Sequence, residues 1–338
     1  MQFDSFSDMK GYSARAFRRD LLSGAASGAS AFPFVLAFAV ASGVSLGQGV
    51  VTAVTAALVV GFLGGSRVQI SGPLVAFVAL SLSVIQQYGF PSLAAATALA
   101  GALMTLLGVL RMGDLVRFIP RAVISGLSAG VAITVIAVEL SPVFGFPVGG
   151  FNADFVGALT SFALGLRFLN PWACAMAAAT FAIIVVFVSL VALIAGMLAV
   201  AFFGIPVETV GSQYVPASFR FPLFSVSPFA IASAQVLFSS AISLAILASV
   251  ESLMGAAVAD GMTGERRDPN RVLLAQGVVN LIVPILGGIP SGGSVSRTAS
   301  VVRGGARTAV AAYTHAAIIL AFAAGGSRAG CSPEARGR

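Results

Sequence analysis

The residues with the clearest capacity for chemistry lie between Gly287 and Arg307, where an apolar segment gives way to glycines, serines, a proline and then arginines. Pro290 lacks an amide hydrogen and the glycines around it are flexible, so one helix cannot run through this stretch. We predict that a new helix starts at about Ser294. Its first amide hydrogens would have no partner, and the positive end of its dipole would lie close to Arg297. This arrangement is typical of an anion site, and we expect it at membrane depth.

A second break of the same kind stands early in the chain, at Gly72-Pro73. Proline suits the first turn of a new helix, and each break follows two apolar segments in its own half of the chain. Corresponding interrupted segments in two halves are typical of inverted-repeat transporters, which hold their substrate where the half-helices meet. The alternative is that each break is only a kink or a re-entrant turn that serves packing, because glycine and proline are common in membrane helices.

The composition places most of the chain in a membrane. Hydrophobic residues make up 58% and charged residues only 9% of the 338 residues, whereas a soluble domain carries about 25% charged residues. The net charge of +7 comes from loop arginines without the clustered basic and aromatic residues of a nucleic-acid surface. Ser291-Gly292-Gly293-Ser294 lacks the lysine of a phosphate loop, and no zinc spacing or nucleophile–base pair is present. We therefore expect neither an enzyme nor a bound cofactor, metal or nucleic acid.

The apolar segments predict a polytopic, all-α protein. Residues 1–20 form a polar lead-in, and 325–338 form a polar, disordered tail of atypical composition. The run 172–203 is too long for one span and slightly short for two, since a span needs about 20 residues. We expect it to cross twice. The other predicted spans cover 21–44, 49–63, the stretch from the first break to about 85, 93–110, 123–140, 229–259, 272–286 and 308–324.

Arginine positions predict the orientation of these spans. If the chain starts in the cytoplasm and each span crosses once, most loop arginines fall on the inside, as the positive-inside rule requires. Arg167 and Arg220 would face out. The predicted inside set is Arg67, Arg111, Arg117, Arg121, Arg266, Arg267, Arg271, Arg303 and Arg307. We expect a multi-pass protein of the inner (plasma) membrane with a cytoplasmic N-terminus.

Two charged residues lie within or beside apolar segments. An arginine in the hydrocarbon region is functional by default, so Arg297 is a candidate anion ligand; the alternative is that its side chain reaches the membrane surface. Glu251 follows about twenty apolar or small residues. Protonation would ease its burial, which permits a proton-coupling role. Glu251 could instead be a structural partner of Arg297 or of backbone amides. His315, in the last apolar run, is interpreted as a packing or hydrogen-bonding residue.

A series of ordered motifs over about residues 15–320 resembles the sulfate permease-type (SulP) family of inorganic anion transporters. These motifs are Arg19-Asp20-Leu21, Ala37-Phe38-Ala39, Gly65-Ser66-Arg67, Ile70-Ser71-Gly72-Pro73, Glu251-Ser252-Leu253, Val258 to Gly264, Asp268-Pro269-Asn270, Ala275-Gln276-Gly277, Gly287-Gly288-Ile289-Pro290, Ser296-Arg297-Thr298-Ala299 and Gly305-Ala306-Arg307-Thr308.

The resemblance implies an inverted seven-span repeat transporter fold, split into a core domain and a gate domain, with two half-helix breaks. It implies secondary active transport of a small anion by alternating access, and a homodimer. The first repeat would cover 21–205 and an incomplete second repeat 228–324. The anion would be held between the two half-helices; the residues implied are Phe38, Gly72, Pro73, Gly293, Ser294, Ser296 and Arg297, with Glu251 as the coupling residue.

Two departures from the family pattern bear on the substrate. Some bicarbonate-transporting relatives form part of a sodium site from an aspartate at position 251 and a threonine four residues later. This chain has Glu251 and Gly255 there, and Leu74 where those relatives have threonine after Gly-Pro. These departures favour sulfate carried by proton-coupled symport over sodium coupling. Bicarbonate and dicarboxylates remain the alternatives.

Two further departures concern the extent of the fold. The resemblance implies a basic loop between the sixth and seventh spans, but Phe187 to Leu190 runs straight on. It also implies three further spans after residue 324, so we expect the last three spans to be missing from a C-terminally truncated chain. The alternatives to an active transporter are a non-functional fragment and a channel-like or structural membrane protein.

Overall fold

The protein folds as a bundle of helices that encloses two short strands of two residues each. A computed structural model describes residues 12–64, 66–113, 121–146, 155–186, 189–205, 234–264 and 268–329. The first half contains α2 (Ala14–Ala41), α3 (Leu46–Leu63), β1 (Ser71–Gly72), η1 (Val75–Phe77), α4 (Val78–Val109), α5 (Arg121–Val143), α6 (Phe155–Gly165), η3 (Leu166–Phe168), α7 (Pro171–Val186) and α8 (Ser189–Phe203). The second half contains α10 (Ala234–Thr263), α11 (Pro269–Ile285), β2 (Gly292–Gly293), α12 (Val295–Arg303) and α13 (Val310–Ala329).

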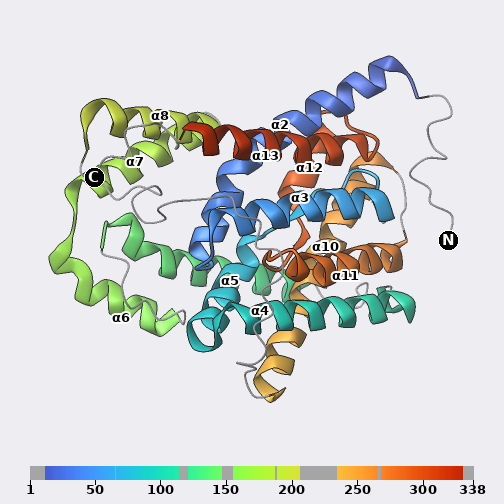
Figure 1. Ribbon diagram of the computed structural model, residues 1–338, viewed down its shortest axis with the longest axis horizontal. Helices are drawn as coiled ribbons and strands as arrows, with labels where there is room; N and C mark the ends of the chain where they lie inside the picture. Colours follow the sequence, from blue (N-terminus) through green and yellow to red (C-terminus); the bar gives the residue numbers. More distant parts are fainter. Residues whose placement is uncertain are drawn as a thin grey trace.

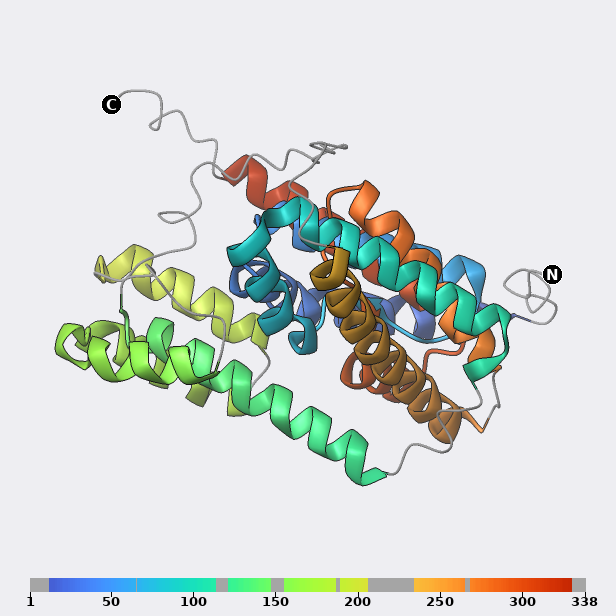
Figure 2. The same cartoon turned by 90° about the horizontal axis from the view of Figure 1, so that it is seen from below.

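The helices form two groups, which agrees with the expected division into a core and a gate. α4 packs along α11, α2 packs along α13, and α10 lies against α4 and α12; with α3 these helices form the helix body. α6, α7 and α8 lie together to one side of it, and α5 joins them to the body (Figure 1). The same separation is visible from below (Figure 2). The two short strands lie inside the helix body, so the body positions the candidate site.

The first helix begins earlier than its predicted span. Ser13 is the N-cap of α2, and its hydroxyl oxygen accepts a hydrogen bond from the amide of Ala16. The basic residues after Ser13 therefore extend the helix instead of forming part of a separate lead-in, because arginine and alanine are both good helix formers. Residues 1–11 of that lead-in lie outside the described residues.

Several predicted spans are shorter or more bent than a simple crossing. Four helices of the described part are long and apolar enough to cross a membrane, or five if the pair Val156–Phe168 and Pro171–Ile184, bent by 120°, counts as one. α4 contains the predicted boundary between two spans: Gly89 has φ 79° and ψ 169°, and Pro91 follows. The run 172–203 forms two helices, α7 and α8, that contact each other. Residues 187–188, 206–233 and 330–338, which include parts of the predicted loops, span and tail, lie outside the described residues.

Glycines allow the helices of the body to approach closely. A β-carbon on Gly24 would lie 2.3 Å from the carbonyl oxygen of Ala311, and one on Gly28 would lie 2.8 Å from that of His315. The small residues of the first span therefore permit close packing against α13. Between α4 and α11, a β-carbon on Gly101 would lie 2.7 Å from the carbonyl oxygen of Gly277 and from the amide nitrogen of Leu281.

We expect Gly101→Ala to lower the midpoint of thermal unfolding in detergent. The added methyl group would meet backbone atoms of α11 that cannot rotate away, and overpacking of this kind costs about 1–3 kcal/mol. Gly126→Ala in α5 is the matched control, because nothing lies within 4 Å of its β-carbon position. Equal midpoints for the two variants would show that the α4–α11 approach does not limit stability.

Candidate functional site

The two predicted breaks meet as a two-stranded antiparallel sheet. Ser71 pairs with Gly293 and Gly72 pairs with Gly292, so the segment before the first half-helix runs alongside the segment before the second. The amide of Ser294 extends the pairing by donating to the carbonyl oxygen of Ile70, at 2.9 Å. The sequence predicted that the breaks would face each other, but it gave no sign that they would pair as strands.

The second half-helix starts at the predicted residue. Ser294 is the N-cap of α12, and its hydroxyl oxygen accepts from the amide of Arg297 at 3.3 Å. The hydroxyl of Thr298 accepts from the amide of Ile70 at 3.1 Å, which ties the first turn of α12 to the chain entering β1. The start of α12 is therefore fixed against β1, and its first amides and positive dipole end lie beside the strand pair.

The side chain of Arg297 extends towards the first break and does not lie along its own helix. Its Nη2 donates to the carbonyl oxygen of Pro73 at 2.6 Å. Its Nη1 is buried, has no partner among the described residues, and lies 3.2 Å from the β-carbon position of Gly72. The surface-reaching alternative is therefore not the conformation observed. A buried guanidinium nitrogen with a hydrogen to donate, beside a helix start, can bind an anionic oxygen.

Polar side chains from neighbouring helices hold the strands in place. Asn280 of α11 accepts from the amide of Ser291 and donates to its carbonyl oxygen, each at 2.9 Å. Thr52 of α3 accepts from the amide of Ile289 at 2.8 Å, and Gln276 donates to the hydroxyl of Ser71. The contacts of Asn280 and Thr52 pair backbone groups that a break in a membrane protein would otherwise leave unsatisfied.

Sequence reasoning did not assign roles to these residues, although a signal was present. Gln276 and Asn280 are four residues apart in a predicted apolar span, so they share a helix face, and both are buried. Polar residues in such a position commonly form hydrogen bonds between helices.

α10 meets β2 at a pair of glycines. The amide of Gly293 donates to the hydroxyl of Ser252 at 2.9 Å. Nε2 of Gln69 donates to the carbonyl oxygen of Ser252 at 2.7 Å, and it lies 3.2 Å from the β-carbon position of Gly255. A β-carbon on Gly293 would lie only 2.0 Å from the same nitrogen. The side-chain amide of Gln69 therefore occupies the space that the absent β-carbons of Gly255 and Gly293 leave open.

Glu251, directly before Ser252, lies at this junction of α10 and β2 and is half-buried. Its carboxylate forms no hydrogen bond or ion pair with any residue in the described part of the chain. The interpretation of Glu251 as a structural partner of Arg297 thus has no contact to support it in this conformation.

The remaining predicted site residues differ in placement. Ser296 has an exposed side chain whose hydroxyl lies 3.4 Å from that of Ser294. Its hydroxyl is therefore accessible at the start of α12. Phe38 is half-buried in α2, with its ring 6.2 Å from the ring of Phe34. No hydrogen bond or ring contact in the described residues joins Phe38 to the strand pair, so its role stays a prediction.

A buried aspartate anchors α12 and α13 to the first helix. Asp20 of α2 accepts from the hydroxyls of Tyr12 and Thr308, and from the amide of Arg307 at 2.7 Å. Burial and the hydrogen bond to Asp20 raise the pKa of Tyr12 to about 12, so the phenol stays protonated and donates. The hydroxyl of Ser23 donates to the carbonyl oxygen of Val301 at 2.7 Å. The half-helix that carries Arg297 is thereby fixed at both of its ends.

Other buried groups in the described part of the chain do not assemble a metal site. No cluster of three or more histidine, cysteine, aspartate or glutamate side chains suited to a metal ion occurs in the searched, described residues. His315 is fully buried, and its Nδ1 lies 3.1 Å from the hydroxyl of Ser27. This contact agrees with the interpretation of His315 as a hydrogen-bonding residue between α13 and α2.

Known proteins are similar to this chain in sequence and in fold. The model of the sulfate permease family matches residues 17–329. The putative sulfate transporter YvdB of Bacillus subtilis is 32% identical over 320 residues, which cover 92% of this chain and 60% of YvdB. The transmembrane domain of a cyanobacterial bicarbonate transporter, BicA, superimposes with a TM-score of 0.80 at 22% identity, covering 94% of this chain and 84% of that one. The structure of murine Slc26a9, an anion transporter, superimposes with a TM-score of 0.80 at 16% identity, covering 95% of this chain and 58% of that one.

These matches identify the fold and the membrane location. The chain spans about 60% of the length of the curated relatives that it matches. The relatives named are transporters rather than enzymes, and the fold that they share is the one implied by the two breaks. This is a multi-pass membrane protein, and it belongs to the sulfate permease family.

Proposed function

We propose that this chain binds a small inorganic anion, with sulfate as the favoured substrate, as part of a secondary active transporter that works by alternating access. The observation that carries the proposal is the antiparallel pairing of β1 with β2, which places the start of α12 and the side chain of Arg297 beside the first break. In this proposal, Nη1 of Arg297, the first amides of α12 and the hydroxyls of Ser294 and Ser296 bind the anion.

Coupling to protons is proposed through Glu251. An ionised carboxylate within the membrane is costly without a partner, and Glu251 has no hydrogen-bond or ion-pair partner among the described residues. A proton that binds together with the anion would also offset the charge that the anion brings. The site would then accept a divalent anion only when Glu251 is neutral.

Sodium coupling has less support from the same junction. Nε2 of Gln69 carries partial positive charge and fills the space beside Gly255 and Gly293. Leu74 is buried in an apolar cluster with Phe77, so its side chain offers no oxygen to a cation. A sodium ion at this position would have to displace the amide nitrogen of Gln69, because hard cations bind oxygen ligands and are repelled by N–H donors.

The proposed setting follows from the arginine distribution and the family. We propose that the protein lies in the inner (plasma) membrane with a cytoplasmic N-terminus, since Arg15, Arg18 and Arg19 open the first helix. A homodimer is proposed from the family resemblance alone.

Uptake of radiolabelled sulfate into proteoliposomes tests the function. We expect an inward proton gradient to drive uptake above the level in protein-free liposomes, and a protonophore to abolish the increase. A sodium gradient of equal size should not replace the proton gradient. Absence of gradient-driven uptake, with sulfate binding retained, would restrict the function to binding.

Bicarbonate is the second candidate because some of the matching relatives are named bicarbonate transporters. BicA of Picosynechococcus, named a bicarbonate transporter, is 28% identical over 327 residues. Competition distinguishes the two candidates: unlabelled sulfate should reduce labelled sulfate uptake at lower concentration than bicarbonate does. Stronger competition by bicarbonate, together with a requirement for sodium, would favour the second candidate.

A further inference from the structure

A group of exposed arginines occupies the end of the molecule where α2 begins. Arg15, Arg18 and Arg19 are spaced so that they share one face of α2, and Asp20 lies on the side that faces the turn between α12 and α13. The stem of Arg19 contacts that turn, with its Cδ 3.6 Å from the β-carbon position of Gly305. The arginine surface consists of Arg15, Arg18, Arg19, Arg303 and Arg307, all of them exposed.

Within the part of the chain that the structure describes, little acidic charge balances the arginine surface. The carboxylate of Asp20 is buried and already accepts three hydrogen bonds. Asp260 lines a small hollow together with Arg67 and Arg307. The surface therefore carries excess positive charge that the candidate anion site does not use, because Arg297 points towards Pro73 inside the helix body.

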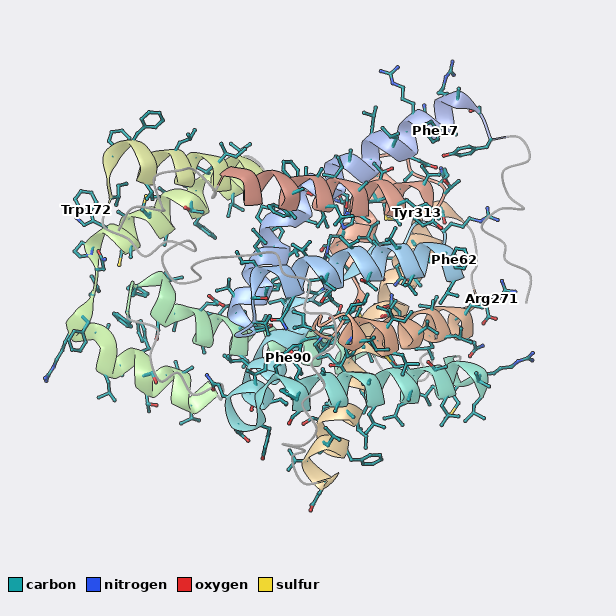
Figure 3. All side chains as sticks on the ribbon, viewed as in Figure 1. Phe17, Phe62, Phe90, Trp172, Arg271 and Tyr313 are labelled. Atoms are coloured by element: carbon teal, nitrogen blue, oxygen red, sulfur yellow. The ribbon has the colours of Figure 1, made fainter. Side chains whose placement is uncertain are left out.

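Exposed apolar side chains accompany these arginines on the first turns of α2. Phe17 is 47% exposed, Leu21 is 40% exposed and Leu22 is 55% exposed. Figure 3 shows Phe17 near the beginning of α2, where the helix extends beyond its neighbours. Arginines beside apolar residues at the start of a spanning helix suit the zone between lipid tails and phosphate groups, because the apolar groups insert while the guanidinium groups reach the phosphates.

We propose that the arginine surface binds the phosphate groups of anionic phospholipids and so braces the turn between α12 and α13 against α2. Charge complementarity identifies the occupant, since a basic surface at the membrane boundary attracts anionic lipids. The bound lipids would reinforce the contacts of Asp20 and hold the half-helix that carries Arg297. This inference concerns membrane lipids and does not depend on which anion the central site binds.

Lipid titration of the purified protein in detergent tests the inference. We expect phosphatidylglycerol to raise the midpoint of thermal unfolding, and phosphatidylcholine at equal concentration to have little effect. Each arginine near an anionic surface contributes about fivefold in affinity. The double variant Arg18→Gln/Arg303→Gln should therefore need about 25-fold more phosphatidylglycerol for half of the full rise in the unfolding midpoint. Arg111→Gln/Arg167→Gln removes the same charge from exposed positions elsewhere and should respond like the wild type.

Three outcomes would overturn the proposal. Phosphatidylcholine could act as strongly as phosphatidylglycerol, or both double variants could respond like the wild type. Inorganic phosphate alone could reproduce the full effect, which would indicate a site for a free anion instead of a lipid surface. If Arg18→Gln/Arg303→Gln fails to fold, raising the salt concentration on the wild type serves as the second measurement. Screening should then reduce the response to phosphatidylglycerol.

Discussion

Replacing Arg297 with alanine is expected to abolish sulfate uptake while leaving the protein inserted in the membrane. The variant loses the guanidinium whose Nη1 is buried beside Gly72 without a partner among the described residues. Hydrogen bonds to charged groups contribute about 1.5–3 kcal/mol, so sulfate binding should weaken roughly 10- to 100-fold. Isothermal titration in detergent measures this loss directly, and proteoliposome uptake measures its consequence.

Two controls separate binding from folding in this variant. Arg167→Ala removes an equal charge from an exposed position in η3 and should leave sulfate affinity unchanged. Arg297→Lys keeps a positive charge but cannot reach both Pro73 and an anion with two separate nitrogens, so it should show intermediate affinity. Unaltered uptake by Arg297→Ala would remove this residue from the site.

Replacing Glu251 with glutamine should separate anion binding from pH. If one proton binds together with the anion, the affinity of the wild type rises as the pH falls, by up to about tenfold per pH unit. Glutamine imitates the protonated carboxyl group, so the variant should bind sulfate with an affinity that no longer changes with pH. Its uptake should also continue without stimulation by a proton gradient.

Glu139 provides the matched control for this experiment. It is a half-buried carboxylate in α5, and we interpret it as an interfacial residue outside the site. Glu139→Gln should retain the pH dependence of the wild type. A wild-type pH profile in Glu251→Gln would exclude Glu251 as the coupling residue, and loss of pH dependence in Glu139→Gln would move that role to α5.

Much of the helix body could be predicted from the order of apolar segments and breaks. Pro290 and its neighbouring glycines stop one helix, and a serine three residues before Arg297 caps the next, so the start of α12 was predicted at the residue observed. These are local effects of backbone chemistry, which act over one helical turn. The beginning of α2 was missed because the arginines after Ser13 suggested a surface lead-in, although they also favour a helix.

The pairing of the two breaks could not be predicted at the level of residues. Which atom bonds to which depends on contacts across the whole chain, such as Ser71 with Gly293, more than two hundred positions apart. Gln69 illustrates the difficulty: its amide reaches Ser252 only because Gly255 and Gly293 both leave room for it. Such a fit depends on three distant segments at once, and no local pattern in the sequence records it.

Locating a bound anion would show whether Arg297 and the start of α12 form the binding site. Selenate has the shape and charge of sulfate and can be located by its anomalous scattering in crystals of the protein. We predict that selenate binds beside Nη1 of Arg297, between the strand pair and the first turn of α12. Selenate bound at saturation elsewhere, with this position empty, would contradict this prediction.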